Sequence, residues 1–248
     1  MFLKPQNLNN RNALVTGAGK GIGRACAIAL AEAGADLIIV SRTKNDLSSV
    51  EKAIKKLKSK CTSIACDVTN YEEIKELFSQ IKKLDILVNN AGIGIGDPLL
   101  EMSLEDWRRQ NAINLDGVFL GTKHSIPLIH ESGGGSIIIM SSVAGLRGSP
   151  GLAGYGASKG GVRLFAKSAA LECANAGLNV RVNSVHPGII DTPIWTKISA
   201  QGLVPGGNAI NPDVLASDTV AHRAGRPQEI ADGVLYLASD LAAYVNGS

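Results

Sequence analysis

The feature that most constrains this chain is a glycine-rich segment between a strand-like run and a helix-like run. The apolar run 12–16 leads directly into Thr16–Gly23 (TGAGKGIG), where a helical pattern begins. Glycines let a backbone turn sharply and approach an anion closely, and the free N–H groups of a helix start favour a phosphate. Because the segment stands between a strand and a helix, it predicts a dinucleotide-binding turn.

The spacing of these glycines is T-G-x-x-x-G-x-G, carried by Gly17, Gly21 and Gly23. The common G-x-G-x-x-G pattern fits no register, since its last position falls on Ile22, Arg24 or Cys26. We expect this turn to hold the pyrophosphate. The residues predicted to contact it are Gly17, Gly19, Lys20, Gly21, Ile22 and Gly23.

Short apolar runs alternate with helical patterns along the chain. Such alternation predicts βαβ units, and continuous apolar strands fit a parallel sheet covered on both faces. We therefore expect an α/β fold, with residues 1–248 forming a single doubly wound Rossmann-type domain. The predicted strands are 12–16, 35–41, 62–66, 84–89, 136–141 and 180–185, and the predicted helices lie near 22–34, 45–58, 71–82, 103–130, 155–176 and 227–238.

Composition excludes several classes of protein. With 45% hydrophobic and 19% charged residues, the chain can build a core and is not disordered. It shows no run of about 18 apolar residues and no secretory signal, so we expect no membrane partner. The four cysteines form no CxxC and are expected to be buried thiols in a reducing cytoplasm.

Two further binding functions are disfavoured. The lysines of 52–60 are interpreted as a solvated helix face and not as a nucleic-acid site, because no aromatic residues are interleaved among them. The four histidines show no metal-ligand spacing, so no metal site is predicted. His186 is interpreted as a packing residue.

A tyrosine and a lysine four residues apart form the candidate catalytic pair. Tyr155 and Lys159 share a helix face, and Ser142 lies 13 residues before the tyrosine, just past a predicted strand. A nearby ammonium is expected to lower the pKa of the phenol, which makes it a usable acid and base. Tyr71 and Lys75 have the same spacing, but Lys58 stands in the position of the serine, so we interpret them as structural.

These motifs together resemble the short-chain dehydrogenase/reductase family, in its branch of about 250 residues, over essentially the whole chain. N-N-A-G at 89–92 and a P-G segment at 187–193 stand in the family's order. The resemblance implies an oxidoreductase that acts on ketones or secondary alcohols. Further cofactor contacts that it implies are Asp67 and Val68 at the adenine, Asn90, Ala91 and Gly92 at the adenosine half, and Pro187, Gly188, Ile190 and Thr192 at the nicotinamide.

The resemblance also implies roles for the catalytic residues. Tyr155 donates the proton to the carbonyl oxygen, Ser142 hydrogen-bonds the same oxygen, and Lys159 binds the nicotinamide ribose and tunes the tyrosine. Asn114 matches the helix-kinking asparagine that orders a water for proton relay, with Asn111 as a rival.

Basic residues at the end of the second strand indicate which dinucleotide binds. An NAD site is expected to have a carboxylate there, whereas this chain has Ser41 and Arg42. Arg42, with Lys20 from the turn, can hold a 2′-phosphate through charge-assisted hydrogen bonds. We therefore expect a preference for NADP(H), with NAD(H) possible.

The substrate is predicted to lie beyond the carboxyl ends of the strands, among 93–97, 143–154 and 189–217. The lining is expected to be mostly apolar and uncharged, which suits a neutral, hydrophobic, cyclic or bulky ketone. The segment 189–217 is a candidate lid, although its apolar side chains pack equally well on the domain. The named lid residues are Trp195, Ile198 and Leu203, and Val204 is expected in the apolar lining.

Two alternatives remain at this point. A 3-oxoacyl-[acyl-carrier-protein] reductase is disfavoured because Gly133 and Ala176 stand where that branch carries arginines. A non-enzymatic dinucleotide sensor is disfavoured because the Tyr155–Lys159 pair is kept. The family implies a homotetramer or homodimer. It also implies a seventh strand starting near Asn246, so we expect that strand to be truncated or missing.

Overall fold

The computed structural model describes residues 6–196, 198 and 210–248. Its centre is a six-stranded parallel sheet in the order β3-β2-β1-β4-β5-β6. The sheet confirms the predicted fold class, and every strand lies within two residues of its predicted bounds. The strands are β1 (Asn12–Thr16), β2 (Asp36–Ser41), β3 (Cys61–Ala65), β4 (Ile86–Asn89), β5 (Gly135–Met140) and β6 (Val180–Val185).

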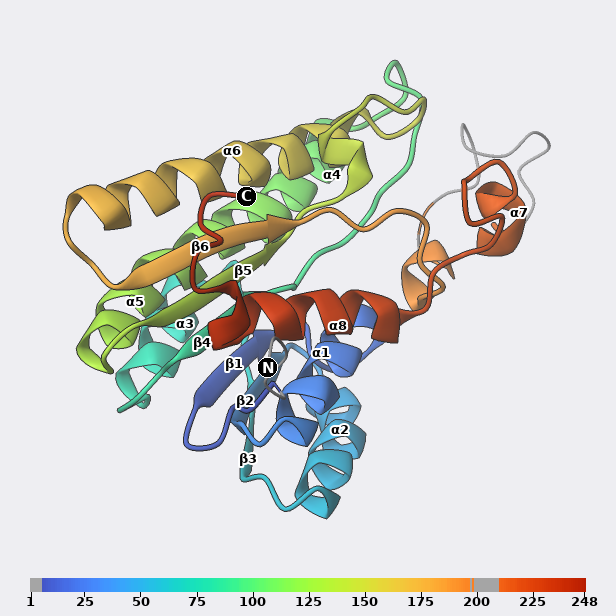
Figure 1. Cartoon of the computed structure of the whole chain (residues 1–248). Helices are drawn as coiled ribbons and strands as arrows, with labels where there is room; N and C mark the ends of the chain where they lie inside the picture. Colours follow the sequence, from blue (N-terminus) through green and yellow to red (C-terminus); the bar gives the residue numbers. More distant parts are fainter. Residues whose placement is uncertain (1–5, 197, 199–209) are drawn as a thin grey trace.

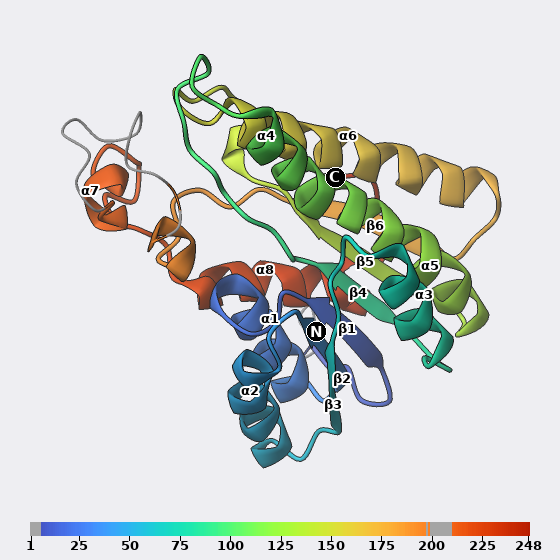
Figure 2. The same ribbon diagram turned by 180° about the vertical axis from the view of Figure 1, so that it is seen from behind.

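Helices cover both faces of the sheet because successive strand residues point in opposite directions. Ala13 and Val15 pack beneath α1, α2 and α8, whereas Leu14 packs beneath α3, α5 and α6. Figure 1 shows the first group at the front, and Figure 2 shows α3 to α6 on the opposite side. The helices are α1 (Gly21–Glu32), α2 (Lys44–Lys56), α3 (Tyr71–Ser79), α4 (Leu104–Asn111), α5 (Gly117–Glu131), α6 (Ala153–Asn175), α7 (Pro212–Ala216) and α8 (Pro227–Ala238).

The prediction of a single helix over 103–130 is wrong in one respect. The segment forms two helices, α4 and α5, joined by a π-helical turn, Ala112–Asp116. At this turn the buried Asn114 side chain bonds the backbone of Ile93 instead of facing a helical neighbour. Periodicity alone does not reveal such a turn, because one extra residue barely disturbs the apolar pattern.

The free edge of β6 is bonded by the last described residues. The Gly247 N–H donates to Val182 O, the Ser184 N–H donates to Ser248 O, and the Val182 N–H donates to the Asn246 side chain. Residues 246–248 therefore occupy the edge at which the seventh strand was expected, without forming one of the six strands of the described sheet. The pairing satisfies backbone groups that an open edge would leave to solvent.

Packing at the start of β5 leaves no room for a side chain. A Cβ on Gly135 would overlap Asp85 O and approach Ile129 at 3.0 Å. We predict that Gly135→Ala lowers the free energy of unfolding by about 1–3 kcal/mol, the usual cost of overpacking. Urea unfolding followed by circular dichroism measures this change.

The matched control is Gly233, which is exposed inside α8 with open space around its Cβ position. Gly233→Ala should stabilise the protein by about 0.5–1 kcal/mol, because alanine is the better helix former. Equal effects of the two substitutions would contradict this description of β5 packing.

Candidate active site

The carboxyl ends of β1 and β4 meet at the point where the strand order reverses. Thr16 Oγ1 accepts hydrogen bonds from the N–H groups of Asn90 and Ala91, each at 3.0 Å. The Asn90 side chain in turn donates to Thr16 O at 3.0 Å and to Gly17 O at 3.3 Å. Asn90 therefore fixes the glycine turn, and Thr16 is a residue of the site that the sequence prediction left out.

Two glycines of the turn are required by its shape. Gly17 has φ +64° and Gly21 has φ +55°, a region that favours glycine. A Cβ on Gly23 would overlap Gly17 O and the Asn90 amide. The first turn of α1 can therefore approach β4 closely, and the first N–H groups of a helix have no partner within the helix. This backbone suits a pyrophosphate.

The basic residues predicted at the 2′-phosphate are at the same end of the cavity. Lys20 and Arg42 both line it. Lys20 Nζ pairs with Asp46 Oδ2 at 3.0 Å, a contact that the sequence did not predict. Ser41 Oγ donates to Thr43 O and shapes the bend after β2. Among the residues described, Arg42 makes no ion pair within 4 Å.

Asp67 and Val68 lie after β3, at the side of the site expected for an adenine. The Asp67 carboxylate accepts from the N–H and the hydroxyl of Thr69 at 2.9 and 2.8 Å. Val68 is buried against Gly117 at the π-helical turn. Neither residue borders the described cavity. Their predicted adenine contact stays a prediction.

Three of the four predicted catalytic residues, Ser142, Tyr155 and Lys159, share a cavity of about 450 Å³ with the glycine turn, whereas Asn114 does not line it. Tyr155 and Lys159 come from the first turns of α6, and Ser142 follows β5. The other predicted cofactor residues that line this cavity are Gly17, Lys20, Gly21, Ile22, Arg42, Asn90, Gly92, Pro187, Gly188, Ile190 and Thr192.

Burial shifts the pKa values of the predicted catalytic pair. Lys159 donates to Met140 O at 2.8 Å, and burial lowers its pKa to about 8. The predicted lowering of the Tyr155 pKa is not found in the structure. Burial raises this pKa, and the hydrogen bond with Ser142 opposes the rise only in part. The ammonium lies 5.7 Å from the centre of the phenol ring and does not outweigh the desolvation of the phenolate.

The structure distinguishes between the two candidate asparagines. Asn114 is fully buried, accepts from the Ile93 N–H at 2.8 Å and donates to Ile93 O at 2.9 Å. A Cβ on Gly92 would stand 3.2 Å from its side-chain oxygen and 3.4 Å from Lys159 Nζ, so Asn114 lies beside the catalytic lysine. Asn111 instead bonds Trp107 O at an exposed position. The geometry therefore favours Asn114.

A second buried amide supports the same loop. Gln110 accepts from the Ile95 N–H at 2.9 Å, one helical turn before Asn114. Together the two side chains hold the segment that begins at Ile93, which lines the cavity. Sequence reasoning left out Gln110 because only its burial distinguishes it from other polar helix residues.

His186 makes more contacts than a packing residue would need. Its Nδ1 is 3.3 Å from Ser142 O and its Nε2 is 3.0 Å from Ser184 Oγ. Burial lowers the pKa of His186, partly opposed by the Ser142 carbonyl. The ring therefore contacts the backbone carbonyl of Ser142 and not its hydroxyl.

The substrate side is less uniform than expected. Its apolar wall includes Val143, Leu152 and Trp195, as predicted, but Arg147 also lines the cavity. The expectation of an uncharged lining is therefore wrong at this position. Charge on a long loop cannot be assigned to a cavity from sequence, because loop direction depends on tertiary contacts.

The structure describes only part of the segment that was predicted to be a lid. Trp195 Nε1 donates to Ile190 O at 2.7 Å, and Ile198 is buried against Gly94 across the cavity. These residues pack on the domain and line the cavity at once. Leu203 and Val204 lie outside the described residues.

The remaining candidate groups lie away from this site or form no site. Tyr71 is 46% exposed and lies near His124, with ring centres 6.0 Å apart, which fits its interpretation as structural. The four cysteines are buried and unpaired. Within the described ranges, no three His, Cys, Asp or Glu side chains gather as a metal site, and no helix is both long and apolar enough to cross a bilayer.

Comparison with known proteins identifies the family. The family model described as short chain dehydrogenase matches residues 11–202. The 3-oxoacyl-[acyl-carrier-protein] reductase FabG of Thermotoga maritima is 37% identical over 97% of this chain and 95% of its own length. A cyclopentanol dehydrogenase of Comamonas sp. is 36% identical over 97% of this chain and 94% of its own length. The chain belongs to the short-chain dehydrogenase family.

Solved structures agree with this assignment. A short-chain type dehydrogenase/reductase from Mycobacterium marinum superposes with a TM-score of 0.89, at 32% identity over 100% of this chain and 96% of that one. Levodione reductase superposes with a TM-score of 0.88, at 30% identity over 97% of this chain and 95% of that one. The chain is an oxidoreductase of alcohols or ketones that uses a nicotinamide dinucleotide.

Thr16 provides a test of how the site is held. Thr16→Val keeps the shape but removes the acceptor for two N–H groups, each costing about 1–3 kcal/mol when buried without a partner. We predict that this variant is less stable and binds the dinucleotide at least tenfold more weakly, as measured by thermal unfolding and calorimetric titration.

The control for this test is Thr16→Ser, which keeps the hydroxyl. It should retain most of the stability and the affinity, because the hydroxyl can still accept both N–H groups. Full dinucleotide affinity in the valine variant would show that the hydroxyl does not hold the turn.

Proposed function

We propose that this protein is an NADP(H)-dependent carbonyl reductase or alcohol dehydrogenase. The observation that carries the proposal is the shared cavity, in which Ser142, Tyr155 and Lys159 lie beyond the same sheet edge as the glycine turn. No other described element brings a comparable acid, donor and cation beside a phosphate-binding turn.

In the proposed reaction, the dinucleotide supplies or accepts a hydride when bound. Tyr155 donates a proton to the carbonyl oxygen, and Ser142 Oγ hydrogen-bonds the same oxygen. Removing one such donor typically costs a factor of about 10²–10³ in kcat. Lys159 binds the nicotinamide ribose, stabilises the phenolate left behind and supplies the proton that restores the phenol. Asn114 orients a water that then returns a proton to Lys159.

The donor geometry supports these roles. Ser142 Oγ accepts from the Ala144 N–H at 3.1 Å and keeps its own proton to donate, toward Tyr155 or toward a substrate oxygen. Ser141 Oγ donates to Lys159 O at 2.8 Å and fixes the second turn of α6 against the end of β5. This bond joins the end of β5, which precedes Ser142, to α6, which carries Tyr155, so the two side chains are held in a fixed relation.

The preference for NADP(H) is supported by charge. Arg42 is exposed and lines the cavity, and Lys20 can exchange its contact with Asp46 for a phosphate. A 2′-phosphate there would make charge-assisted hydrogen bonds to both. The NADP-dependent (R)-specific alcohol dehydrogenase of Lentilactobacillus kefiri, 35% identical over 97% of this chain and 94% of its own length, is compatible with this preference.

We propose a ketone with a bulky or cyclic apolar body as substrate, because apolar side chains form much of the wall beside Ser142. The similarity to FabG favours a second candidate, the 3-oxoacyl-[acyl-carrier-protein] reductase. Against it, Gly133 and Ala176 offer no guanidinium to a carrier protein. Initial rates on cyclic, steroid and 3-oxoacyl ketones with each cofactor distinguish these substrates.

The assembly is proposed to be a homotetramer or homodimer in the cytoplasm. An exposed apolar face supports this proposal. Leu164 and Leu171 stand seven residues apart on α6, so they share a face, and they are 63% and 65% exposed. Phe119 of α5 packs edge-on against Phe165 beside them. We also propose that residues 1–248 act as one domain, with 189–217 as its lid.

The proton donor is tested by Tyr155→Phe. Removing the hydroxyl should lower kcat for ketone reduction at least a thousandfold while NADPH affinity changes little, because the ring and Lys159 remain. Stopped-flow absorbance at the NADPH band measures the rate, and fluorescence titration measures the affinity. A variant with full turnover would disprove the assigned acid.

The 2′-phosphate contact is tested by Arg42→Asp. The substitution replaces an attraction by a repulsion, so the KM for NADPH should rise at least tenfold while the KM for NADH stays within about threefold. Lys44→Asp is the matched control, since Lys44 is an exposed cation at the start of α2 that does not line the cavity. Equal changes for both cofactors would contradict the assignment.

A further inference from the structure

The charged side chains that line the described cavity are all basic. Four basic side chains line it and no acidic one does. Three of the four belong to the proposed cofactor half: Lys20 and Arg42 at the phosphate, and Lys159 at the ribose. Arg147 is the one left over, and it comes from the opposite, substrate-facing loop between β5 and α6.

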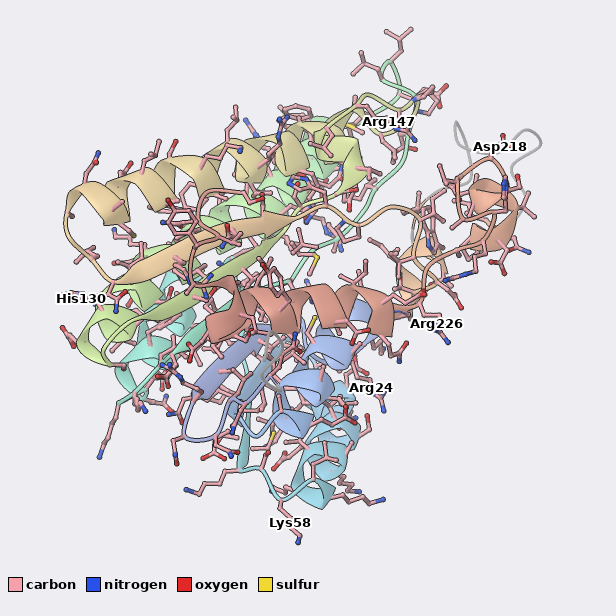
Figure 3. The ribbon with its side chains drawn as sticks, viewed as in Figure 1. Arg24, Lys58, His130, Arg147, Asp218 and Arg226 are labelled. Atoms are coloured by element: carbon pink, nitrogen blue, oxygen red, sulfur yellow. The ribbon has the colours of Figure 1, made fainter. Side chains whose placement is uncertain are left out.

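Arg147 has no counter-charge from its own chain. Within the described residues, no carboxylate lies within 4 Å of its guanidinium. The stretches outside the described residues cannot supply one, because 1–5, 197 and 199–209 contain no Asp or Glu. Figure 3 shows Arg147 on the loop at the α4 end of α6, well away from Arg24 on α1.

The neighbours of Arg147 restrict what it can bind. Val143 and Leu152, from the same loop, line the cavity with it, and Ile194 and Trp195 line it from the segment after β6. Ser142, which is proposed to bond the reacting oxygen, lies five residues before Arg147, so one loop carries both side chains. A ligand that fills this half meets an apolar wall and one cation.

We propose that Arg147 binds an anionic group, a carboxylate or a phosphate, on a substrate whose body is apolar. This inference rests on the proposed ketone reduction and replaces the neutral substrate expected from sequence. The planar guanidinium donates paired hydrogen bonds to either anion. The positive cavity also raises the local concentration of such a substrate.

The test compares two pairs of ketones, each with one anionic and one neutral member. One pair is 4-oxocyclohexanecarboxylate and its methyl ester, which places the charge on the ketone itself. The other is acetoacetyl coenzyme A and the neutral acetoacetyl thioester of N-acetylcysteamine, which places it on the phosphates of a carrier group. The quantity measured is the ratio of kcat/KM for the anionic member over the neutral member, at saturating NADPH.

We expect a ratio of at least ten in one of the two pairs, and that pair identifies the source of the anion. Arg147→Gln should bring this ratio close to one, whereas Arg147→Lys should keep part of it. Arg24→Gln is the matched control, because Arg24 is an exposed arginine outside the cavity lining. It should leave the ratio unchanged. Added salt should lower the wild-type ratio.

A ratio near one for both pairs, or a ratio that Arg147→Gln does not change, overturns the inference while ketone reduction itself stands. Calorimetric titration of the protein–NADP⁺ complex with 4-oxocyclohexanecarboxylate and with coenzyme A decides the case in which no ketone is reduced. Binding of either anion that is lost in Arg147→Gln then supports the anion site and rejects the proposed reaction. Binding that is unaffected, or absent for both, rejects the anion site too.

Discussion

The close approach of the β1–α1 turn to the end of β4 is the constraint on which the rest of this site depends. Thr16 Oγ1 receives two N–H groups of the β4 loop, and the Asn90 amide returns two hydrogen bonds to the turn. A side chain on Gly23 would prevent this contact. Because the strand order reverses here, the contact opens a crevice above the sheet, and parallel α/β sheets bind their ligands in such crevices.

The proposed catalytic residues are held beside that crevice by contacts with the backbone more than by contacts with each other. Lys159 is fixed by Met140 O, Ser141 bonds Lys159 O, and His186 supports Ser142 O. Burial raises the pKa of Tyr155 and lowers that of Lys159 to about 8, so burial moves the two pKa values apart. We infer that a bound dinucleotide, whose hydroxyls would meet Lys159, completes the tuning that sequence spacing attributes to the lysine alone.

Much of the fold could be predicted because its signals are local. The predicted bounds of β1 and α8 match the structure to the residue, because the apolar run of β1 and the proline that begins α8 mark these bounds in the sequence. The Ser142, Tyr155 and Lys159 set also follows from fixed spacings. The resemblance implied a kink at Asn114, but periodicity did not show that it is a π-helical turn. The Lys20–Asp46 pair and the position of Arg147 could not be predicted, because each depends on contacts between segments distant in sequence.

We infer that a hydride passes between a dinucleotide and a carbonyl carbon in this cavity, while Tyr155 transfers the proton. The most direct measurement is label transfer from NADPH that carries deuterium at C4 of the nicotinamide, with cyclohexanone as acceptor and mass spectrometry of the alcohol formed. With one or the other C4 epimer of the labelled cofactor, the deuterium should appear on the carbinol carbon in nearly every product molecule. Product without deuterium from both epimers, or no NADPH-dependent product from any ketone offered, would contradict it.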